Sequence, residues 1–341
     1  MKLVKLNTTL LPARAIHVHE PPQPTDRYNT SFHPASSAPS LLRPLDTPYS
    51  YARWLPLILC TRAPPTTPSL CPAVQTIRLT RAQTALLHSA AEASLPRGDG
   101  EVNRLFREDL EDTIIPVLER EVIFPPEGLF VRFDEFSPKD GAGPAAIGNA
   151  GEVVRKVVTS VRARNVLGNF LEDKGESEGV EMFFMRWDGR MAAEREYRVF
   201  CRPGDGKVSA VSQYRWWTGW RFGGVGEEEQ ERVVKRVRRG AEEVRGLILE
   251  EAERRGEEED RLLVEQGFSF DLLYDEDGDT CELVELNTFG VRSACGSCLF
   301  QWVDDRRVLY GEEEAEFRVA TSGIEGFVSF DMIQEGHGVV S

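Results

Sequence analysis

The chain has 341 residues, of which 41% are hydrophobic and 28% are charged, so it can form one large domain or two ordinary ones. Its formal net charge of −15 argues against nucleic acid as a main partner, and no stretch reaches the roughly 18 apolar residues of a membrane span. Six cysteines indicate a reducing compartment rather than a disulfide scaffold, and the first 30 residues lack a secretion signal, so we expect a cytoplasmic protein.

The first predicted elements follow an unstructured start. Residues 1–47 are rich in Pro, Ser and Thr without sustained periodicity, which predicts a disordered tail. The run 51–59 begins the folded part. Beyond a proline-rich loop, the pattern predicts a strand near residues 76–79 and helices over 81–94 and 103–119.

The second half of the chain predicts hairpins between helices. A strand over 128–133 leads into a glycine-bearing loop, called the glycine loop below, which contains Gly141, Gly143, Gly148 and Gly151. The elements that follow are a helix over 152–171, strands over 181–187, 195–202 and 207–217, a charged helix pair over 226–263 broken near Gly240 and Gly256, and a last hairpin of strands 268–274 and 280–287. This order predicts an α+β fold with an antiparallel sheet at its centre.

The last hairpin carries the most informative residues. Glu285 and Asn287 share one face of their strand because side chains alternate. If the turn takes residues 277–279, Asp271 lies directly opposite Glu285. Two carboxylates and an amide oxygen then converge on one patch, and these are ligands that Mg²⁺ accepts. The sequence therefore predicts a metal site formed by these three residues.

The alternative is a set of ordinary polar residues on a solvent-facing sheet. Leu283 is expected on the face of Glu285, and apolar residues crowd the partner strand, so the hairpin has the pattern of a buried one. Buried acids need a partner, which favours the metal site. The acidic turn 275–279 superficially resembles a calcium loop, but its twelfth position is Leu286 rather than glutamate, so we discount calcium.

Two further sets of residues are suited to phosphate groups. With a four-residue turn over 203–206, Glu196 would face Gln213, and Arg198, on the face of Glu196, could reach a phosphate. Taken alone, this hairpin favours an Arg–Glu pair on the strand surface. Arg132 lies in the strand before Lys139 and the glycine loop, where side-chain charge and backbone amides can meet a phosphate. That loop has neither the Walker pattern nor a dinucleotide fingerprint.

Two other clusters permit competing interpretations. The aromatic cluster Trp216, Trp217, Trp220 and Phe222 can stack a base, form a partner-binding patch or form a small aromatic core. The pair Cys295 and Cys298 can be a redox dithiol or half of a zinc site, although two packed thiols are the simpler interpretation.

Short motifs follow one another in order over residues 51–318. They are Trp54-Leu-Pro56, Phe130-Val-Arg132-Phe with Ser137-Pro-Lys-Asp140, Met185-Arg-Trp187, Glu196-Tyr-Arg-Val-Phe200, Val211-Ser-Gln213, Phe270-Asp271, Glu285-Leu-Asn287-Thr-Phe-Gly290 and Leu299-Phe-Gln-Trp302. In this order and spacing, the sequence resembles the cell division cycle protein 123 family, a divergent branch of the ATP-grasp superfamily. Each motif is modest alone, and the combination is specific.

The resemblance implies an ATP-grasp-like fold with two subdomains built around antiparallel sheets with flanking helices, which hold ATP and Mg²⁺. The expected division is a subdomain over 48–180, a second with the metal hairpin over 181–318, and a C-terminal extension over 319–341. By position, Asp271, Glu285 and Asn287 are the implied metal ligands. The implied ATP-binding residues are Arg132, Lys139, Arg186, Trp187, Glu196, Arg198 and Gln213.

Proteins of that family are assembly factors in translation initiation. They bind the gamma subunit of translation initiation factor two and promote assembly of its trimer, so the resemblance implies an ATP- and magnesium-binding assembly chaperone connected with the cell cycle. One alternative is an ATP-grasp carboxylate–amine ligase that forms an acyl phosphate, with Arg186 and Arg215 as substrate-binding cations. Another is a degenerate scaffold that binds no nucleotide.

Several departures from the family pattern keep these alternatives open. Arg132 replaces a lysine of the family pattern, and Thr288 replaces a proline. Met185 stands where the family has an arginine, in the strand that leads to the hinge contacting adenine. The Cys295-Gly-Ser-Cys298 segment stands where Thr-Asp-Ser is expected. No lysine is recognised in the helix after the glycine loop, where Val158 lies nearby. The metal ligands match the pattern better than the basic residues do.

Overall fold

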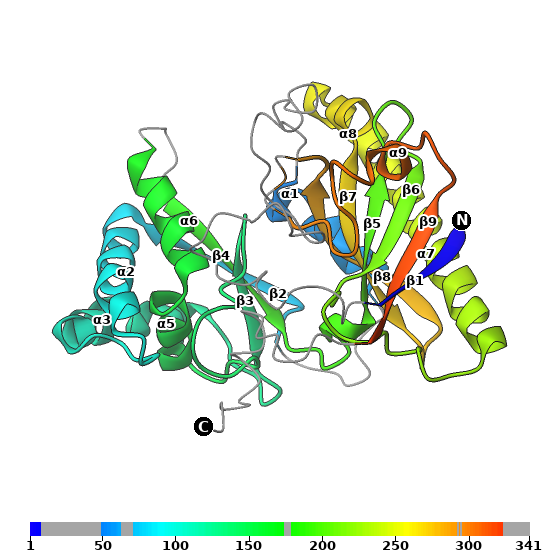
Figure 1. Ribbon diagram of the computed structural model, residues 1–341. Helices are drawn as coiled ribbons and strands as arrows, with labels where there is room; N and C mark the ends of the chain where they lie inside the picture. Colours follow the sequence, from blue (N-terminus) through cyan, green and yellow to red (C-terminus); the bar gives the residue numbers. More distant parts are fainter. Residues whose placement is uncertain (8–48, 63–70, 174–178, 292, 294, 323–341) are drawn as a thin grey trace. The chain divides into compact units, whose positions relative to one another are not determined.

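The computed structural model describes residues 1–7, 49–62, 71–173, 179–291, 293 and 295–322, which form two compact units. Unit 1 combines the described residues up to 62 with those from 189 onward, and unit 2 comprises the described residues 71–188. Each unit contains one sheet with helices packed against it (Figure 1). The predicted α+β class is therefore confirmed.

The sheet of unit 1 has six strands in the order β1-β9-β6-β5-β7-β8. Neighbouring strands are antiparallel except for β9, which runs parallel to both β1 and β6. Every residue of β5, β6 and β7 is buried, so both faces of the sheet's centre are covered. The strands are β1 (Lys2–Asn7), β5 (Glu196–Cys201), β6 (Val208–Gln213), β7 (Phe268–Asp275), β8 (Thr280–Thr288) and β9 (Glu316–Ser322).

The edge strand β1 differs from the sequence prediction. Residues 2–7 were expected in a disordered tail but form a strand that pairs with β9, beginning with Lys2 opposite Glu316. Six residues are too few to show a clear period, and their partner lies at the other end of the sequence, so no local pattern reveals the strand. Residues 8–48 lie outside the described residues. Residues 319–322, expected in a C-terminal extension, belong to β9.

The long helix α7 (Glu227–Arg255) packs against β8 and β6 in unit 1. The predicted break at Gly256 is confirmed, since this glycine ends the helix with a φ of 66°. The predicted break at Gly240 is wrong. Gly240 lies against β8, where an added Cβ would stand 2.3 Å from the Cys281 Sγ, so it permits close packing without interrupting the helix.

The remaining helices of unit 1 are short. They are α1 (Tyr51–Thr61), the 3₁₀ turns η5 (Ala193–Arg195) and η6 (Glu258–Asp260), α8 (Arg261–Gln266) and α9 (Arg306–Leu309). Helix α1 packs against β8 and α7, and α9 packs against β6.

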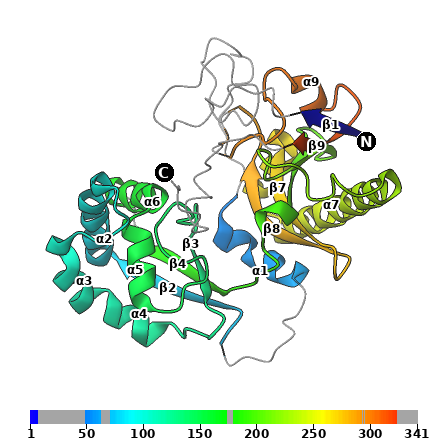
Figure 2. The ribbon, with the colours of Figure 1, turned by 60° about the horizontal axis from the view of Figure 1, so that its bottom comes forward.

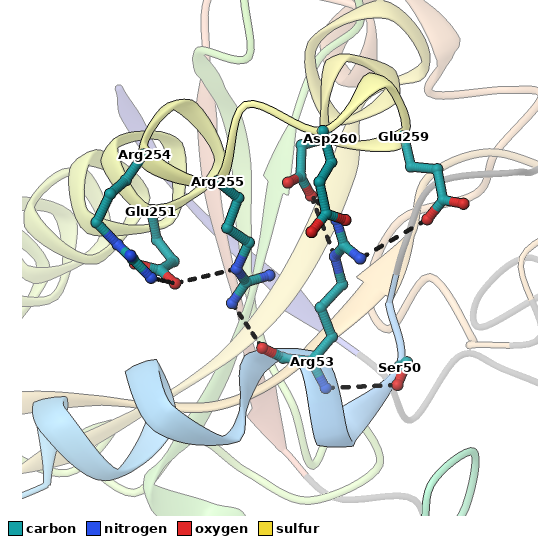
Figure 3. Close-up of polar contacts among 8 residues, drawn as sticks. Ser50, Arg53, Glu251, Arg254, Arg255, Glu259 and Asp260 are labelled. Carbon is teal, nitrogen blue, oxygen red and sulfur yellow. Dashed lines mark hydrogen bonds and ion pairs between the residues drawn. The ribbon is translucent and has the colours of Figure 1, made fainter.

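Arg53 of α1 forms ion pairs with residues that follow α7, and α7 itself reaches α1 through Arg255 (Figure 3). Arg53 donates from Nη2 to the buried Asp260 carboxylate at 2.7 Å and to Glu257 at 2.7 Å. Arg255 donates to the Arg53 carbonyl at 2.6 Å while its guanidinium lies 4.6 Å from the centroid of the Trp54 ring. The buried Trp54 is thereby fixed between the two helices.

Unit 2 has a three-stranded antiparallel sheet in the order β2-β4-β3, with helices packed against it (Figure 2). Its strands are β2 (Val74–Thr80), β3 (Leu129–Phe133) and β4 (Gly179–Arg186). Its helices are α2 (Arg81–Ser94), η3 (Leu95–Arg97), η4 (Arg104–Phe106), α3 (Arg107–Thr113), α4 (Ile115–Glu121), α5 (Ala150–Val158) and α6 (Val161–Glu172). Helix α2 covers the sheet and contacts α5 and α6.

Two predicted helices of unit 2 are each divided in two. The predicted helix 103–119 is divided at Ile114, because Pro116 has no N–H to donate and its ring would clash with the preceding turn. The predicted helix 152–171 is divided at Ser160, whose Oγ caps α6 by accepting from the Ala163 N–H. Among the helices that the structure describes, none is both long and apolar enough to cross a membrane.

Candidate metal and nucleotide site

The register of β7 and β8 places Asp271 directly opposite Glu285, as the sequence predicts, but the turn and the strand pairing that lead to this register differ from the prediction. The turn takes four residues, 276–279, rather than three. A bulge at Val284 then restores the predicted pairing. The four-residue turn pairs Leu283 with Leu272, and the bulge then places Glu285 on the opposite face, so the expectation that Leu283 shares the face of Glu285 is wrong.

A row of polar side chains runs across the sheet of unit 1 in register. Arg318 of β9 is opposite Ser212 of β6, Ser212 is opposite Arg198 of β5, Arg198 is opposite Asp271, and Asp271 is opposite Glu285. Residues opposite each other in neighbouring strands share a sheet face. The fold thus brings two of the predicted metal ligands together with the predicted phosphate-binding Arg198.

Arg198 and Asp271 form a two-pronged ion pair within this row. The guanidinium donates from Nε to Oδ1 and from Nη2 to Oδ2, each at 2.8 Å, and both side chains are at least 95% buried. Burial opposes the charge of Arg198, but the adjacent Asp271 outweighs it, so the pKa of the guanidinium is raised well above its ordinary value. The site therefore already holds a cation against the Asp271 carboxylate.

Asn287 completes the predicted ligand set on the same face, since it pairs with Ser269 two positions from Asp271. Its Oδ1 accepts from the Cys295 thiol at 2.6 Å, and among the residues that the structure describes its buried Nδ2 has no hydrogen-bond partner. Half a turn of the amide would direct its oxygen to the position of that orphaned nitrogen. Asp271 and Asn287 are buried and Glu285 is partly exposed. Two carboxylates and an amide oxygen on one sheet face are a donor set that fits Mg²⁺.

The cysteine pair lies beside this ligand set. Within the described residues neither cysteine forms a disulfide; Cys295 is partly exposed and Cys298 is buried. Burial raises the pKa of the Cys298 thiol to about 12, although Arg198 acts in the opposite direction. Cys298 packs among Trp216, Trp217 and Leu299, which agrees with its interpretation as a packed thiol.

The β5–β6 hairpin corrects a second predicted register. Tyr197, not Glu196, is opposite Gln213, because a bulge near Cys201 shifts the pairing by one residue. Gln213 consequently lies on the sheet face opposite to Arg198. Its Nε2 donates to the carbonyls of Arg215 and Thr218, and its Oε1 accepts from the Ala320 N–H. These bonds hold residues 214–218, which form bends and turns instead of the predicted strand. The buried Glu196 remains on the face of Arg198.

The predicted aromatic cluster is a core feature. Trp216, Trp217 and Trp220 are all at least 93% buried. The Trp220 indole donates to the Tyr197 hydroxyl at 2.9 Å, and Phe222 packs edge-on against the Trp220 ring. Among the interpretations that the sequence left open, the small aromatic core is confirmed.

The acidic turn of the last hairpin is neutralised by arginines. Asp275 receives ion pairs from Arg190 at 3.0 Å and Arg195 at 3.1 Å, and Arg190 also contacts the buried Glu282 at 2.9 Å. These acids are therefore balanced by side chains of the same unit.

Four of the predicted ATP-binding residues belong to unit 2. Arg132 of β3 is 95% buried and donates to the carbonyls of Phe133 and Asp134. Arg186 at the end of β4 is paired with Glu127 at 2.7 Å. Trp187 donates its backbone N–H to the Gly128 carbonyl, and Lys139 is partly exposed in the loop between β3 and α5. Their roles stay predictions.

Sequence reasoning missed a buried lysine of unit 2. Lys156 in α5 is 96% buried and its Nζ donates to the carbonyls of Pro144 at 3.2 Å and Gly141 at 3.4 Å, in the glycine loop. Gly141 must be a glycine here, because an added Cβ would stand 2.0 Å from the Lys156 carbonyl oxygen. The sequence contains a lysine after the glycine loop, two positions before Val158, and its apolar neighbours in α5 were the available signal.

We expect Lys156 to make the stability of unit 2 rise with pH. Burial lowers the pKa of its amine from 10.5 to about 8. Between these two values the folded state has lost a proton that the unfolded state keeps, so the free energy of unfolding rises with pH, by about 3 kcal/mol at most. Below pH 8 the charge is buried in the folded state and this stabilisation is absent.

Urea unfolding of the wild type and Lys156→Met between about pH 7 and pH 10 measures this effect. The stability advantage of the methionine variant should shrink as the pH rises. Using the difference between the two proteins removes the contributions of thiols and tyrosines that titrate in the same window. A difference that stays constant with pH would contradict the assignment.

Comparisons with known proteins bear on the fold. No family model matches the sequence, and no curated protein matches it. The structure is similar to that of Cdc123 from Schizosaccharomyces pombe, with a TM-score of 0.53 and 15% identity over 80% of this chain and 95% of that chain. It is also similar to C-terminally truncated Cdc123 from the same organism, with a TM-score of 0.52 and 15% identity over 80% of this chain and 94% of that chain. The predicted resemblance is thus confirmed at the level of the fold.

Proposed function

We propose that this protein binds ATP together with Mg²⁺ and acts as an assembly chaperone in translation initiation. The observation that carries the nucleotide part is the polar row in unit 1, where the buried Arg198 and Asp271 lie in register with the partly exposed Glu285 and Asn287 shares their face. Opposite charges arranged on one sheet face fit a ligand that combines a cation with an anion, as a magnesium nucleotide does.

In this proposal the metal ligands are Asp271, Glu285 and Asn287. The bound Mg²⁺ would neutralise charge on the phosphate groups, which matters in a chain of formal net charge −15. Arg198 would contact a phosphate through its planar guanidinium. The Nδ2 of Asn287 supports this assignment, because a buried amide nitrogen without an acceptor among the described residues is uncommon. Half a turn of the amide would present its oxygen to the metal at that position.

Unit 2, taken by itself, has two buried cations that suit a phosphate group. Arg132 and Lys156 are both buried, and each donates to backbone carbonyls in the segment that contains the glycine loop. Cations that donate to neutral carbonyls can turn to a more strongly accepting phosphate oxygen. In this proposal Lys156 would contact a phosphate from the helix that follows the glycine loop, where the family pattern has a lysine.

The chaperone part of the proposal rests on the motif resemblance together with the shared fold. The proposed partner is the gamma subunit of translation initiation factor two. A pull-down of the purified gamma subunit by the full chain, with and without ATP and magnesium, tests it directly. Capture that requires ATP supports the proposal. Absence of capture both with and without ATP and magnesium would rule out the gamma subunit as a partner.

The ligase alternative receives less support from the structure. Its two candidate substrate-binding cations are engaged in ion pairs, Arg186 with Glu127 at 2.7 Å and Arg215 with Glu194 at 3.4 Å. An acyl-phosphate ligase needs cations that are available to a carboxylate substrate. Phosphate release in the presence of candidate acids and amines would revive this alternative.

The binding proposal predicts a thermal shift that depends on Glu285. ATP with magnesium at about one hundred times the dissociation constant should stabilise the wild type by about 2.7 kcal/mol, or roughly 5 °C in melting temperature. Glu285→Gln, which removes one ligand charge at nearly constant shape, should lose most of this shift. The matched control is Asp277→Asn, an exposed acid at the tip of the same hairpin, which should retain the shift. Absence of a shift in the wild type would remove the proposal.

A further inference from the structure

The Arg198–Asp271 pair uses the same carboxylate that the proposed metal needs. Both Asp271 oxygens accept from the guanidinium at 2.8 Å, so the main lone pairs of the ligand are engaged by a cation of the protein itself. An arginine is always protonated at physiological pH, so it competes with an added cation at every such pH.

The surroundings of Arg198 keep it in this position. Its Nη1 donates to the Gly296 carbonyl at 2.5 Å, and its guanidinium lies 5.1 Å from the centroid of the Tyr214 ring. With 5% of its side chain exposed, the guanidinium cannot leave Asp271 for water without moving the residues around it. A buried charge that loses its partner is strongly unfavourable, so another anion must replace the carboxylate.

We propose that Arg198 is an internal cation that blocks the metal site until a phosphate group of the nucleotide accepts its guanidinium. This inference rests on the proposed function. A divalent ion alone must displace a buried arginine from Asp271 and therefore binds weakly. A nucleotide supplies the replacement anion, so metal and nucleotide bind cooperatively and each tightens the other by the same factor.

The test measures Mn²⁺ binding to the full chain without nucleotide, from the electron paramagnetic resonance signal of free Mn²⁺. Arg198→Gln removes the competing cation and should bind Mn²⁺ alone about tenfold more tightly than the wild type does. The matched control is Arg195→Gln, which removes an arginine of the same unit that pairs with Asp275 at 3.1 Å and should leave Mn²⁺ affinity unchanged. Equal or weaker Mn²⁺ binding by Arg198→Gln overturns the inference.

A second measurement needs no change at Arg198. A non-hydrolysable ATP analogue should tighten Mn²⁺ binding to the wild type about tenfold or more. If the wild type binds the metal nucleotide but its Mn²⁺ affinity does not depend on the analogue, Arg198 is a structural ion pair and only the inference fails. If neither nucleotide nor metal binds to the wild type, the proposed function fails as well.

Discussion

Replacing Asp271 with alanine is expected to lower the free energy of unfolding of unit 1 by about 3–5 kcal/mol, because it leaves the Arg198 guanidinium buried without its carboxylate. The two groups are each at least 95% buried and share two hydrogen bonds of 2.8 Å. Urea unfolding followed by tryptophan fluorescence measures the change. Unit 1 contains Trp54, Trp216, Trp217, Trp220 and Trp302, so the fluorescence reports mainly on this unit.

The double variant Asp271→Leu with Arg198→Met distinguishes an ion-pair effect from lost packing. It removes both charges while keeping much of the buried volume, so it should be considerably more stable than Asp271→Ala. If the double variant is as unstable as the single one, the energetic role assigned to the pair is wrong. Neither variant should bind ATP with magnesium.

Replacing Gly240 with alanine is expected to destabilise unit 1 by about 1–3 kcal/mol, although alanine is the better helix former. Its Cβ would stand 2.3 Å from the Sγ and 2.4 Å from the Cβ of Cys281, so α7 and β8 would have to separate. The same urea titration measures this effect.

The matched control for Gly240 lies in the same helix. Gly246 has no atom within 4 Å of an added Cβ, so Gly246→Ala should stabilise the protein by up to about 1 kcal/mol through helix propensity. Opposite signs at the two glycines are the expected result. Stabilisation by both substitutions would show that α7 and β8 are less tightly packed than the structure indicates.

The sequence was sufficient for features that depend on neighbouring residues. Helix α2 matches its predicted bounds, and the pairing of Asp271 with Glu285 is as predicted. The sequence was insufficient where one extra residue in a strand, a β-bulge, shifts the pairing of two strands by one position. The bulge at Val284 compensated for a wrongly predicted turn, whereas the bulge near Cys201 placed Gln213 on the other face. Neither bulge carries a glycine or proline that would reveal it.

The ion pair at the centre of the site was also beyond the sequence. Arg198 and Asp271 are far apart in the chain, and only the register of β5 against β7 brings them together. Asp271 alone is a plausible metal ligand, and Arg198 alone is a plausible phosphate-binding residue. Residue type therefore could not show that the two neutralise each other. Lys156 was overlooked for a similar reason, since its pattern in α5 is apolar and its partners are backbone carbonyls.

The pairing of β1 with β9 has a consequence for synthesis of the chain on the ribosome. The sheet of unit 1 needs residues 316–322 between β1 and β6, so it cannot close until nearly all described residues have been translated. The described residues of unit 2 all lie between 71 and 188, so they are translated before β5 to β9. Until β9 has been made, β1 and β6 lack the strand that pairs with both, so their edges stay unpaired while β5 to β8 can already pair with one another.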